Sequence, residues 1–328
     1  MKHPPEIPIL GPLTPGTRQR HLVTLPGMAL SAEPRPVVTI TGANPGPVLL
    51  VGAGVHGGEY PAIEAVIRLA RELDPADIAG TVILMPVLNL PAFWSRTMFV
   101  CPVDNVNPNR VFPGDPTGSY SEQMTHAFVY EFIAHADAYL DLHGGDIPEA
   151  LIPFSICRQG DTDAERRGKE LALAFGLPYV LAVSRPIQQA KGASSYVAAA
   201  EIGVPAVLAE AGGVGQLQEN AVLLLTDGVR RVLRHLGMSN ESVPDVLAPE
   251  VLIAFEWVYS SNAGMFYPRV AAGDVVQQGA AIGTVGSLFG DTLETVIAPV
   301  TGRILFLTIN PAVSAGGLLM GIGASEAD

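Results

Sequence analysis

The sequence predicts a three-layer α/β/α domain with a mixed central sheet, followed by a small all-β domain. Over residues 1–243, short apolar runs alternate with longer segments of helical periodicity, which is typical of a largely buried sheet covered by helices. Over residues 244–328 the helical pattern is lost, and short strands are separated by glycines. A polar stretch with prolines, residues 239–249, lies between the two patterns. We therefore expect two domains, 1–243 and 244–328.

The first domain is expected to contain seven strands and five helices. The strands are placed at 37–41, 48–53, 82–87, 138–142, 152–156, 179–183 and 206–210. The helices are placed at 61–73, 121–134, 164–175, 194–202 and 216–236. Pro61 supports a helix start directly after Glu59, because the first turn of a helix tolerates proline.

The second domain contains an approximate internal repeat. Two sets of residues share one spacing: Gly264, Val275 and Gly279, and then Gly302, Val313 and Gly317. Such twofold similarity predicts two interlocked β half-units. The segment resembles the barrel-sandwich fold of biotinyl and lipoyl domains, which carry a modifiable lysine between their halves. Residues 291–297 contain no lysine, so we expect the fold without a covalent cofactor.

Composition and charge exclude several classes of function. The 328 residues carry a net charge of −13, with an isoelectric point near 4.9, which disfavours binding to nucleic acid or to a membrane surface. No stretch approaches the ~18 apolar residues of a membrane span, and the first ten residues lack the apolar core of a signal peptide. We expect a cytoplasmic protein with two buried thiols, Cys101 and Cys157. Homo-oligomer formation stays open.

A candidate metal site begins at the end of the second expected strand. His56 and Glu59 follow a glycine-rich turn, at the edge where open α/β sheets build their sites. His143 ends another strand, and Asp141 precedes it by two positions and could orient it. A hydrolytic zinc ion usually takes three His or carboxylate ligands and keeps one position for water. The pattern predicts one Zn²⁺ on His56, Glu59 and His143.

Plainer interpretations of these residues stay open. His56 could fill a polar turn, and His143 could be a hydrogen-bonded histidine at a strand end. The turn also contains a formal G-x-G-x-x-G, Gly52 to Gly57, the fingerprint of dinucleotide-binding folds. That fingerprint needs an acidic residue at the end of the next strand, which here ends at Asn89 without one. We therefore interpret the glycines as a requirement of the turn.

Further candidates lie at another strand end and in a loop. Glu210 ends an apolar strand, where a carboxylate is costly unless it is paired or used. It could be a helix cap or an ion-pair partner, or it could act as the general base for a zinc-bound water. Asn109 and Arg110 lie in a turn-rich stretch. The planar guanidinium suits a substrate carboxylate, although a surface arginine is the alternative.

These elements together resemble the succinylglutamate desuccinylase/aspartoacylase family, a branch of the zinc carboxypeptidase-like hydrolases. The ordered set is His56-x-x-Glu59, Asn109-Arg110 with Phe112-Pro113-Gly114, Asp141-Leu142-His143, and Glu210. The similarity covers about residues 37–236, and the trailing β domain also occurs in the family. It implies a zinc carboxypeptidase-like fold and a hydrolase that removes an acyl group from the nitrogen of an amino acid or small amine.

The resemblance also implies roles for single residues. His56, Glu59 and His143 would hold zinc, Glu210 would be the acid/base, and Asn109 with Arg110 would hold the substrate carboxylate.

The chain departs from the family pattern in two places. Family members commonly have another arginine shortly before the Asn-Arg pair, which helps to polarise the scissile carbonyl. Here the nearest candidate is Arg96. Asn107 and Pro108 stand where the family usually has an acid and a leucine. The acyl group, whether acetyl, succinyl or similar, and the amine therefore stay open.

Two alternative functions also stay open. One is a carboxypeptidase that acts on peptide C-termini. The other is a metal-binding or small-molecule-binding protein without turnover, against which the presence of Glu210 argues.

Overall fold

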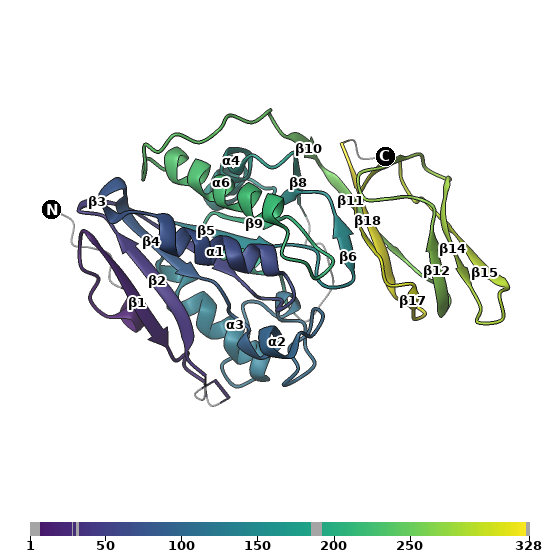
Figure 1. Ribbon diagram of the computed structural model, residues 1–328, viewed down its shortest axis with the longest axis horizontal. Coiled ribbons are helices and arrows are strands. Elements are labelled where there is room, and N and C mark those ends of the chain that lie inside the picture. Colours follow the sequence, from purple (N-terminus) through teal and green to yellow (C-terminus); the bar gives the residue numbers. More distant parts are fainter. Residues whose placement is uncertain (1–6, 28, 31–32, 185–191, 326–328) are drawn as a thin grey trace.

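A mixed sheet forms the centre of the larger part of the molecule (Figure 1). The structure, a computed structural model, describes residues 7–27, 29–30, 33–184 and 192–325. Within them the sheet has nine strands in the order β1-β2-β4-β3-β5-β9-β7-β8-β10. Their bounds are β1 Thr17–Val23, β2 Arg35–Thr41, β3 Asn44–Ala53, β4 Ala79–Met85, β5 Ala138–His143, β7 Phe154–Arg158, β8 Tyr179–Val183, β9 Ala206–Glu210 and β10 Glu250–Leu252. Strands β4, β3, β5 and β9 are parallel neighbours, so their carboxyl ends meet at one edge.

Helices cover both faces of this sheet. One face is covered by α1 (Tyr60–Glu72), α4 (Asp163–Phe175) and α6 (Glu219–His235), which share one core cluster with the strands. The other face is covered by α3 (Tyr120–Glu131) and α5 (Ser195–Glu201). Helix α2 (Leu90–Ser95) and the 3-10 turns are shorter: η1 Pro8–Leu10, η2 Pro75–Asp77, η3 Pro108–Arg110 and η4 Ile133–His135. The predicted three-layer α/β/α class is confirmed.

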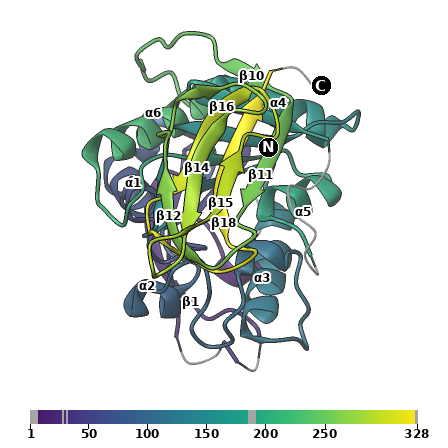
Figure 2. The same ribbon diagram turned by 90° about the vertical axis from the view of Figure 1, so that its right-hand side faces the viewer.

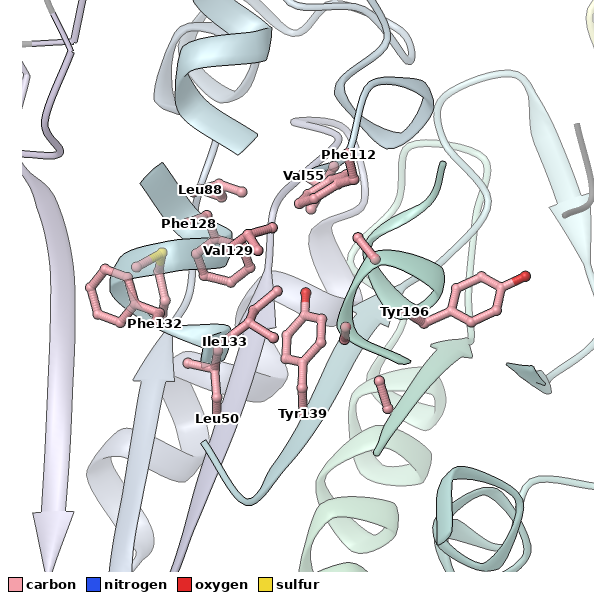
Figure 3. Close-up of a cluster of buried hydrophobic side chains, with 14 of the residues drawn as sticks. Leu50, Val55, Leu88, Phe112, Phe128, Val129, Phe132, Ile133, Tyr139 and Tyr196 are labelled. Atoms are coloured by element: carbon pink, nitrogen blue, oxygen red, sulfur yellow. The ribbon is translucent and has the colours of Figure 1, made fainter. Parts of the chain in front are cut away.

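The core beneath α3 is aromatic. Phe128 of α3 and Phe132, which directly follows the helix, pack with their ring centroids 6.0 Å apart, and Phe128 meets Tyr139 of β5 edge-on at 5.7 Å (Figure 3). All three side chains are almost fully buried. Burial of such large rings contributes strongly to stability. This packing fixes β5, and with it the strand end that carries His143.

The smaller part consists of two antiparallel sheets. One has the order β11-β18-β16-β13, and the other has the order β15-β14-β12-β17. Their bounds are β11 Ala254–Tyr259, β12 Gly264–Pro268, β13 Val275–Val276, β14 Ala281–Gly286, β15 Thr292–Ile297, β16 Gly302–Thr308, β17 Ala312–Val313 and β18 Leu318–Ala324. Side chains from both sheets form one apolar core, as in a sandwich. Figure 2 shows these strands in front of the larger part.

The internal repeat corresponds to exchanged strands. Strand β12 begins the first repeat and pairs with β17 of the second. Strand β16 begins the second repeat and pairs with β13 of the first. Each repeat therefore contributes a strand to both sheets, which is the interlocking that the spacing predicted.

The two parts of the chain are joined by strand pairing. Strand β6 (Glu149–Leu151) comes from the first part but pairs with β16 of the second. Strand β10 follows residue 243 yet pairs with β8 of the central sheet. The boundary between 243 and 244 stays a prediction, and these pairings cross it in both directions.

The sequence patterns located most elements but missed others. All seven strands and five helices expected in the first domain are present, with shifts of a few residues at their ends. Strand β1 was missed; it is an edge strand with alternating exposure, and polar residues on its outer face hide the pattern. Cys101 and Cys157 are buried thiols, as predicted. In the described part of the chain, no helix has the length and apolarity needed to cross a membrane.

Candidate metal centre and substrate cavity

The candidate site forms where β3, β5 and β9 end side by side. The turn after β3 carries His56 and Glu59, while His143 is the last residue of β5 and Glu210 the last residue of β9. His143 and Glu210 are paired in the parallel register of β5 and β9. Residues that are far apart in the sequence therefore meet because neighbouring parallel strands end at the same edge.

Two glycines allow the turn after β3 to pack tightly. A Cβ on Gly57 would lie 2.2 Å from the carbonyl carbon of Ala92, and a Cβ on Gly58 would lie 2.1 Å from Asp146 Oδ1. Neither position has room for a side chain. This crowding supports the interpretation of the glycine pattern as a requirement of the turn.

The three predicted metal ligands form one buried group. One ligand atom from each of His56, Glu59 and His143 lies within 4.8 Å of the others. Glu59 Oε1 lies 2.7 Å from His56 Nδ1, and Glu59 Oε2 lies 2.8 Å from His143 Nδ1. Glu59 is the N-cap residue of α1, but its side chain makes no cap hydrogen bond. Its carboxylate is directed at the imidazoles instead.

The donor set fits a metal ion. The three side chains are at most 7% exposed, and Glu59 Oε2 has no hydrogen-bond partner among the described residues despite its closeness to His143. An unsatisfied buried carboxylate oxygen is costly. Two imidazoles and a carboxylate are a common ligand set of a hydrolytic metal site. The group could therefore bind a metal.

A second oxygen lies against the far nitrogen of each imidazole. Asn107 Oδ1 lies 3.0 Å from His56 Nε2, and Asp141 Oδ2 lies 3.0 Å from His143 Nε2. An acceptor at Nε2 favours a proton there and leaves the Nδ1 lone pair for a metal. Ser195 Oγ donates a hydrogen bond to the same oxygen of Asp141. Asp141 thus faces His143, as the sequence suggested. The position of Asn107 next to His56 was not predicted from the sequence.

The charges of the ligand group are mutually stabilised. Burial alone would raise the pKa of Glu59, but His143 and His56 together lower it to about 2. Burial alone would lower the pKa of His143, but Asp141 and Glu59 hold it well above its ordinary value. In the metal-free protein a negative carboxylate therefore lies beside the positively charged ring of His143. A bound cation would take over the role of the proton on His143.

A cavity of about 580 Å³ opens from this group. Glu210, Asn109 and Arg110 also line it. Burial raises the pKa of Glu210 well above its ordinary value, and Glu59 and Glu149 raise it further, against the opposing effect of His143. Glu210 Oε2 has no hydrogen-bond partner among the described residues. A buried carboxyl group with a free oxygen is suited to proton transfer.

The loop residues Asn109 and Arg110 are held by contacts to helix α5 and to each other. Asn109 Oδ1 accepts a hydrogen bond of 3.1 Å from the backbone N–H of Ser195. Arg110 Nη1 donates one of 2.8 Å to the carbonyl oxygen of Asn109. Burial lowers the pKa of Arg110, but a guanidinium stays charged at neutral pH. Arg110 thus supplies a fixed positive charge in the cavity.

Arg96 is not brought into this group. It is the exposed residue that ends α2, and it is not among the residues that line the cavity. Its substrate-binding role stays a prediction without support from the geometry. The aromatic ring on this side is that of Phe99, whose centroid lies 5.9 Å from that of His56.

The sequence patterns also missed the far wall of the cavity. It is formed by residues of β6 and of the β sandwich: Glu149, Leu151, Phe255, Trp257, Phe306 and Leu318. Because side chains alternate along a strand, the sequence could have indicated that Phe255 and Trp257 lie on the same face of a sheet. The sequence could not indicate which part of the protein these side chains would contact.

Comparison with known proteins agrees with this site. A family model described as the succinylglutamate desuccinylase/aspartoacylase catalytic domain matches residues 45–236. N-alpha-acetyl-L-2,4-diaminobutyric acid deacetylase from Halomonas elongata is 33% identical over 273 residues, which cover 81% of this chain and 77% of that protein.

Solved structures share the whole architecture. The product-bound ectoine utilization protein EutE (DoeB) from Ruegeria pomeroyi has a TM-score of 0.84 at 24% identity, over 95% of this chain and 97% of that chain. A succinylglutamate desuccinylase/aspartoacylase from Rhodobacter sphaeroides has a TM-score of 0.83 at 25% identity, over 95% and 96%. The chain belongs to the succinylglutamate desuccinylase/aspartoacylase family, which confirms the resemblance.

Proposed function

We propose that this protein is a zinc-dependent deacylase that hydrolyses the amide bond of a small N-acyl amino acid. The observation that carries the proposal is the buried group of His56, Glu59 and His143 beside the unpartnered carboxyl oxygen of Glu210, in one cavity. Membership of a deacylase family and the similarity to a deacetylase of N-acetyl-diaminobutyric acid support the reaction class.

Zinc is the cofactor that the ligand set favours. One Zn²⁺ would be held by His56 Nδ1, Glu59 and His143 Nδ1, which are the atoms that face one another. When bound, zinc polarises an acyl carbonyl and lowers the pKa of water to near ~7. The oxygens of Asn107 and Asp141, each 3.0 Å from an imidazole Nε2, favour the tautomer that this binding needs.

Glu210 would move the proton. Its carboxylate takes a proton from the attacking water as the C–O bond forms at the acyl carbon. The same carboxyl group then delivers the proton to the leaving nitrogen as the C–N bond breaks, so that a free amine and a carboxylic acid result. The raised pKa of Glu210 in its buried setting favours this return of the proton.

Arg110 and Asn109 would position the substrate. Arg110 offers a charged, planar donor group to a carboxylate. The Oδ1 atom of Asn109 is engaged by Ser195, so its amide nitrogen is the remaining donor. A carboxylate held there would keep the scissile amide near Glu210, since all three residues line one cavity. Positioning of this kind accounts for a large share of enzymatic rate enhancement.

The β sandwich favours a small substrate over a peptide. Phe255, Trp257 and Phe306 line the same cavity as His56 and Glu59. We expect such a wall to hinder the binding of a longer peptide chain. The carboxypeptidase alternative therefore has less support than the deacylase.

A substitution at Glu210 tests the proposal. We expect Glu210→Gln to lower kcat roughly 10²–10⁴-fold, the usual contribution of general acid–base catalysis, with one zinc per chain retained. N-acetyl and N-succinyl amino acids serve as substrates, and elemental analysis measures the metal. The exposed Glu241→Gln is the matched control.

Two results would contradict this account. Full activity in the Glu210→Gln variant would remove Glu210 from the mechanism. Full activity after removal of all metal by a chelator would remove zinc from it.

A further inference from the structure

Glu149 is a cavity residue that the proposed reaction does not use. It begins β6 and lines the cavity together with Leu151, which lies on the same face of that strand two residues later. Strand β6 pairs with β16, with Glu149 opposite Thr308 and Leu151 opposite Phe306. The side chain is therefore held by the pairing of the two parts of the chain, and it lines the cavity that His56 and Glu59 also line.

The Glu149 carboxylate lacks a partner within the described residues. Its side chain is half-buried, and none of the hydrogen bonds or ion pairs of the described residues involves it. Burial raises its pKa to about 7, and Glu59 and Asp146 contribute, while Arg110 acts in the opposite direction. A buried carboxylate of this kind is costly unless it meets a positive charge. A ligand could supply that charge.

Three aromatic side chains of the cavity lining lie close to one another. The ring centroids of Phe255 and Trp257 are 5.1 Å apart, and that of Phe306 lies 5.5 Å from Trp257. All three side chains line the cavity with Glu149. Aromatic faces attract cations, most strongly where water is excluded. A carboxylate beside aromatic rings is a common way of binding an ammonium group.

Charge in the cavity is arranged to suit a zwitterion. Arg110 is the cation that lines it among the described residues, and it interacts electrostatically with Glu149. If Glu59 binds the metal and Glu210 moves the proton, Glu149 is the remaining carboxylate. Arg110 would then face a substrate carboxylate while Glu149 faces a positive group.

We propose that Glu149, with the aromatic wall of Phe255, Trp257 and Phe306, binds a protonated amine on the side chain of the substrate. The protein would therefore prefer N-acyl amino acids with a cationic side chain. This inference rests on the proposed deacylase function and adds the substrate class to it. Glu149 is a specificity-determining residue in this account and takes no part in bond cleavage.

Three substrates, of which the first two are nearly equal in size, test the preference without any variant. They are the N-α-acetyl derivatives of 2,4-diaminobutyrate, norvaline and glutamate, which have a positive, a neutral and a negative side chain. We expect kcat/KM for the diaminobutyrate derivative to exceed that for norvaline roughly 10-fold or more, as is usual for a hydrogen bond to a charged group. The glutamate derivative should be the poorest. Equal values for diaminobutyrate and norvaline would overturn the inference.

The Glu149→Gln variant then assigns the preference to one carboxylate. We expect kcat/KM for the diaminobutyrate derivative to fall roughly 10-fold or more, mainly through KM, while that for norvaline changes less than about twofold. Glu256→Gln is the matched control, because Glu256 lies between Phe255 and Trp257 but is exposed and does not line the cavity. An equal loss on both substrates would indicate a structural role and overturn the inference.

Binding of the free amine separates this inference from the proposed function. Titration calorimetry of 2,4-diaminobutyrate against the zinc-loaded protein should show roughly 10-fold weaker binding in the Glu149→Gln variant. Absence of deacylase activity on every substrate would refute the proposed function. The calorimetric difference would still decide the role of Glu149, and equal affinities in the two proteins would refute it.

Discussion

At the scale of single residues, the site depends on oxygens that hold the imidazoles in place. His56 and His143 each present Nδ1 to Glu59, and each has an oxygen at Nε2, from Asn107 and Asp141. Such outer contacts fix the tautomer and raise the affinity of the ligand for a metal. Asn107 stands where family members usually have an acid. In this structure the amide oxygen of Asn107 lies 3.0 Å from His56 Nε2.

We expect Asn107→Ala to weaken zinc binding roughly 10–100-fold, the usual effect of losing an outer partner of a metal ligand. Asn107→Asp keeps an oxygen at this place and should retain affinity. Competition with a chromophoric chelator measures the dissociation constant, with the exposed Asn240→Ala as control. Equal affinity in the Ala and Asp variants would show that the oxygen near His56 has no orienting role.

At the scale of elements, the position of β6 determines the state of Glu149. Pairing of β6 with β16 places the carboxyl group in the cavity wall, away from bulk water. Burial raises its pKa from 4.5 to about 7. Below pH 4.5 the group is neutral in both the folded and the unfolded chain. Above that pH the unfolded chain ionises first, so folded-state stability falls until about pH 7 and then stays reduced.

We therefore expect Glu149→Gln to stabilise the metal-free protein at pH 8, by at most about 3 kcal/mol from a shift of this size. The stabilisation should shrink toward pH 5, where Glu149 is neutral in the folded protein. Urea unfolding of both proteins at pH 5 and pH 8 measures the difference. If Glu149→Gln stabilised the protein equally at pH 5 and pH 8, ionisation of Glu149 would not destabilise the folded state.

The helices and strands around the site were largely predictable, since their apolar periodicity is local. The ends of β3, β5 and β9 coincide with His56, His143 and Glu210 within a few residues of the expected positions. Strands β6 and β10 were missed because each has only three residues. Such short segments carry no period that a sequence can reveal.

At the scale of the whole molecule, metal binding should couple to folding. His56, Glu59 and His143 belong to two different strand ends and meet only in the folded chain. A ligand that binds only the folded state stabilises it by about 2.7 kcal/mol when its free concentration is 100-fold above Kd. The ligand group thus links the turn after β3 to the end of β5.

We expect zinc to raise the Tm of the metal-free protein, and His143→Ala to abolish the rise. His235→Ala is the matched control, because His235 is exposed at the end of α6. Differential scanning calorimetry with and without zinc measures both effects. A zinc-dependent rise of equal size in His143→Ala would place the metal elsewhere.

The sequence by itself predicted the reaction class of the family, a candidate ligand set and the strands that carry it. This was possible because the candidate ligands are His and Glu residues at the ends of strands that the apolar pattern locates, as at His56-x-x-Glu59 and Asp141-Leu142-His143. The tertiary structure decided which side chains line the cavity. Glu149, Phe255, Trp257 and Phe306 come from β6, β11 and β16, and they meet only because β6 pairs with β16. Contacts between distant strands depend on register and packing, which no local pattern records. The exposed position of Arg96 was decided in the same way.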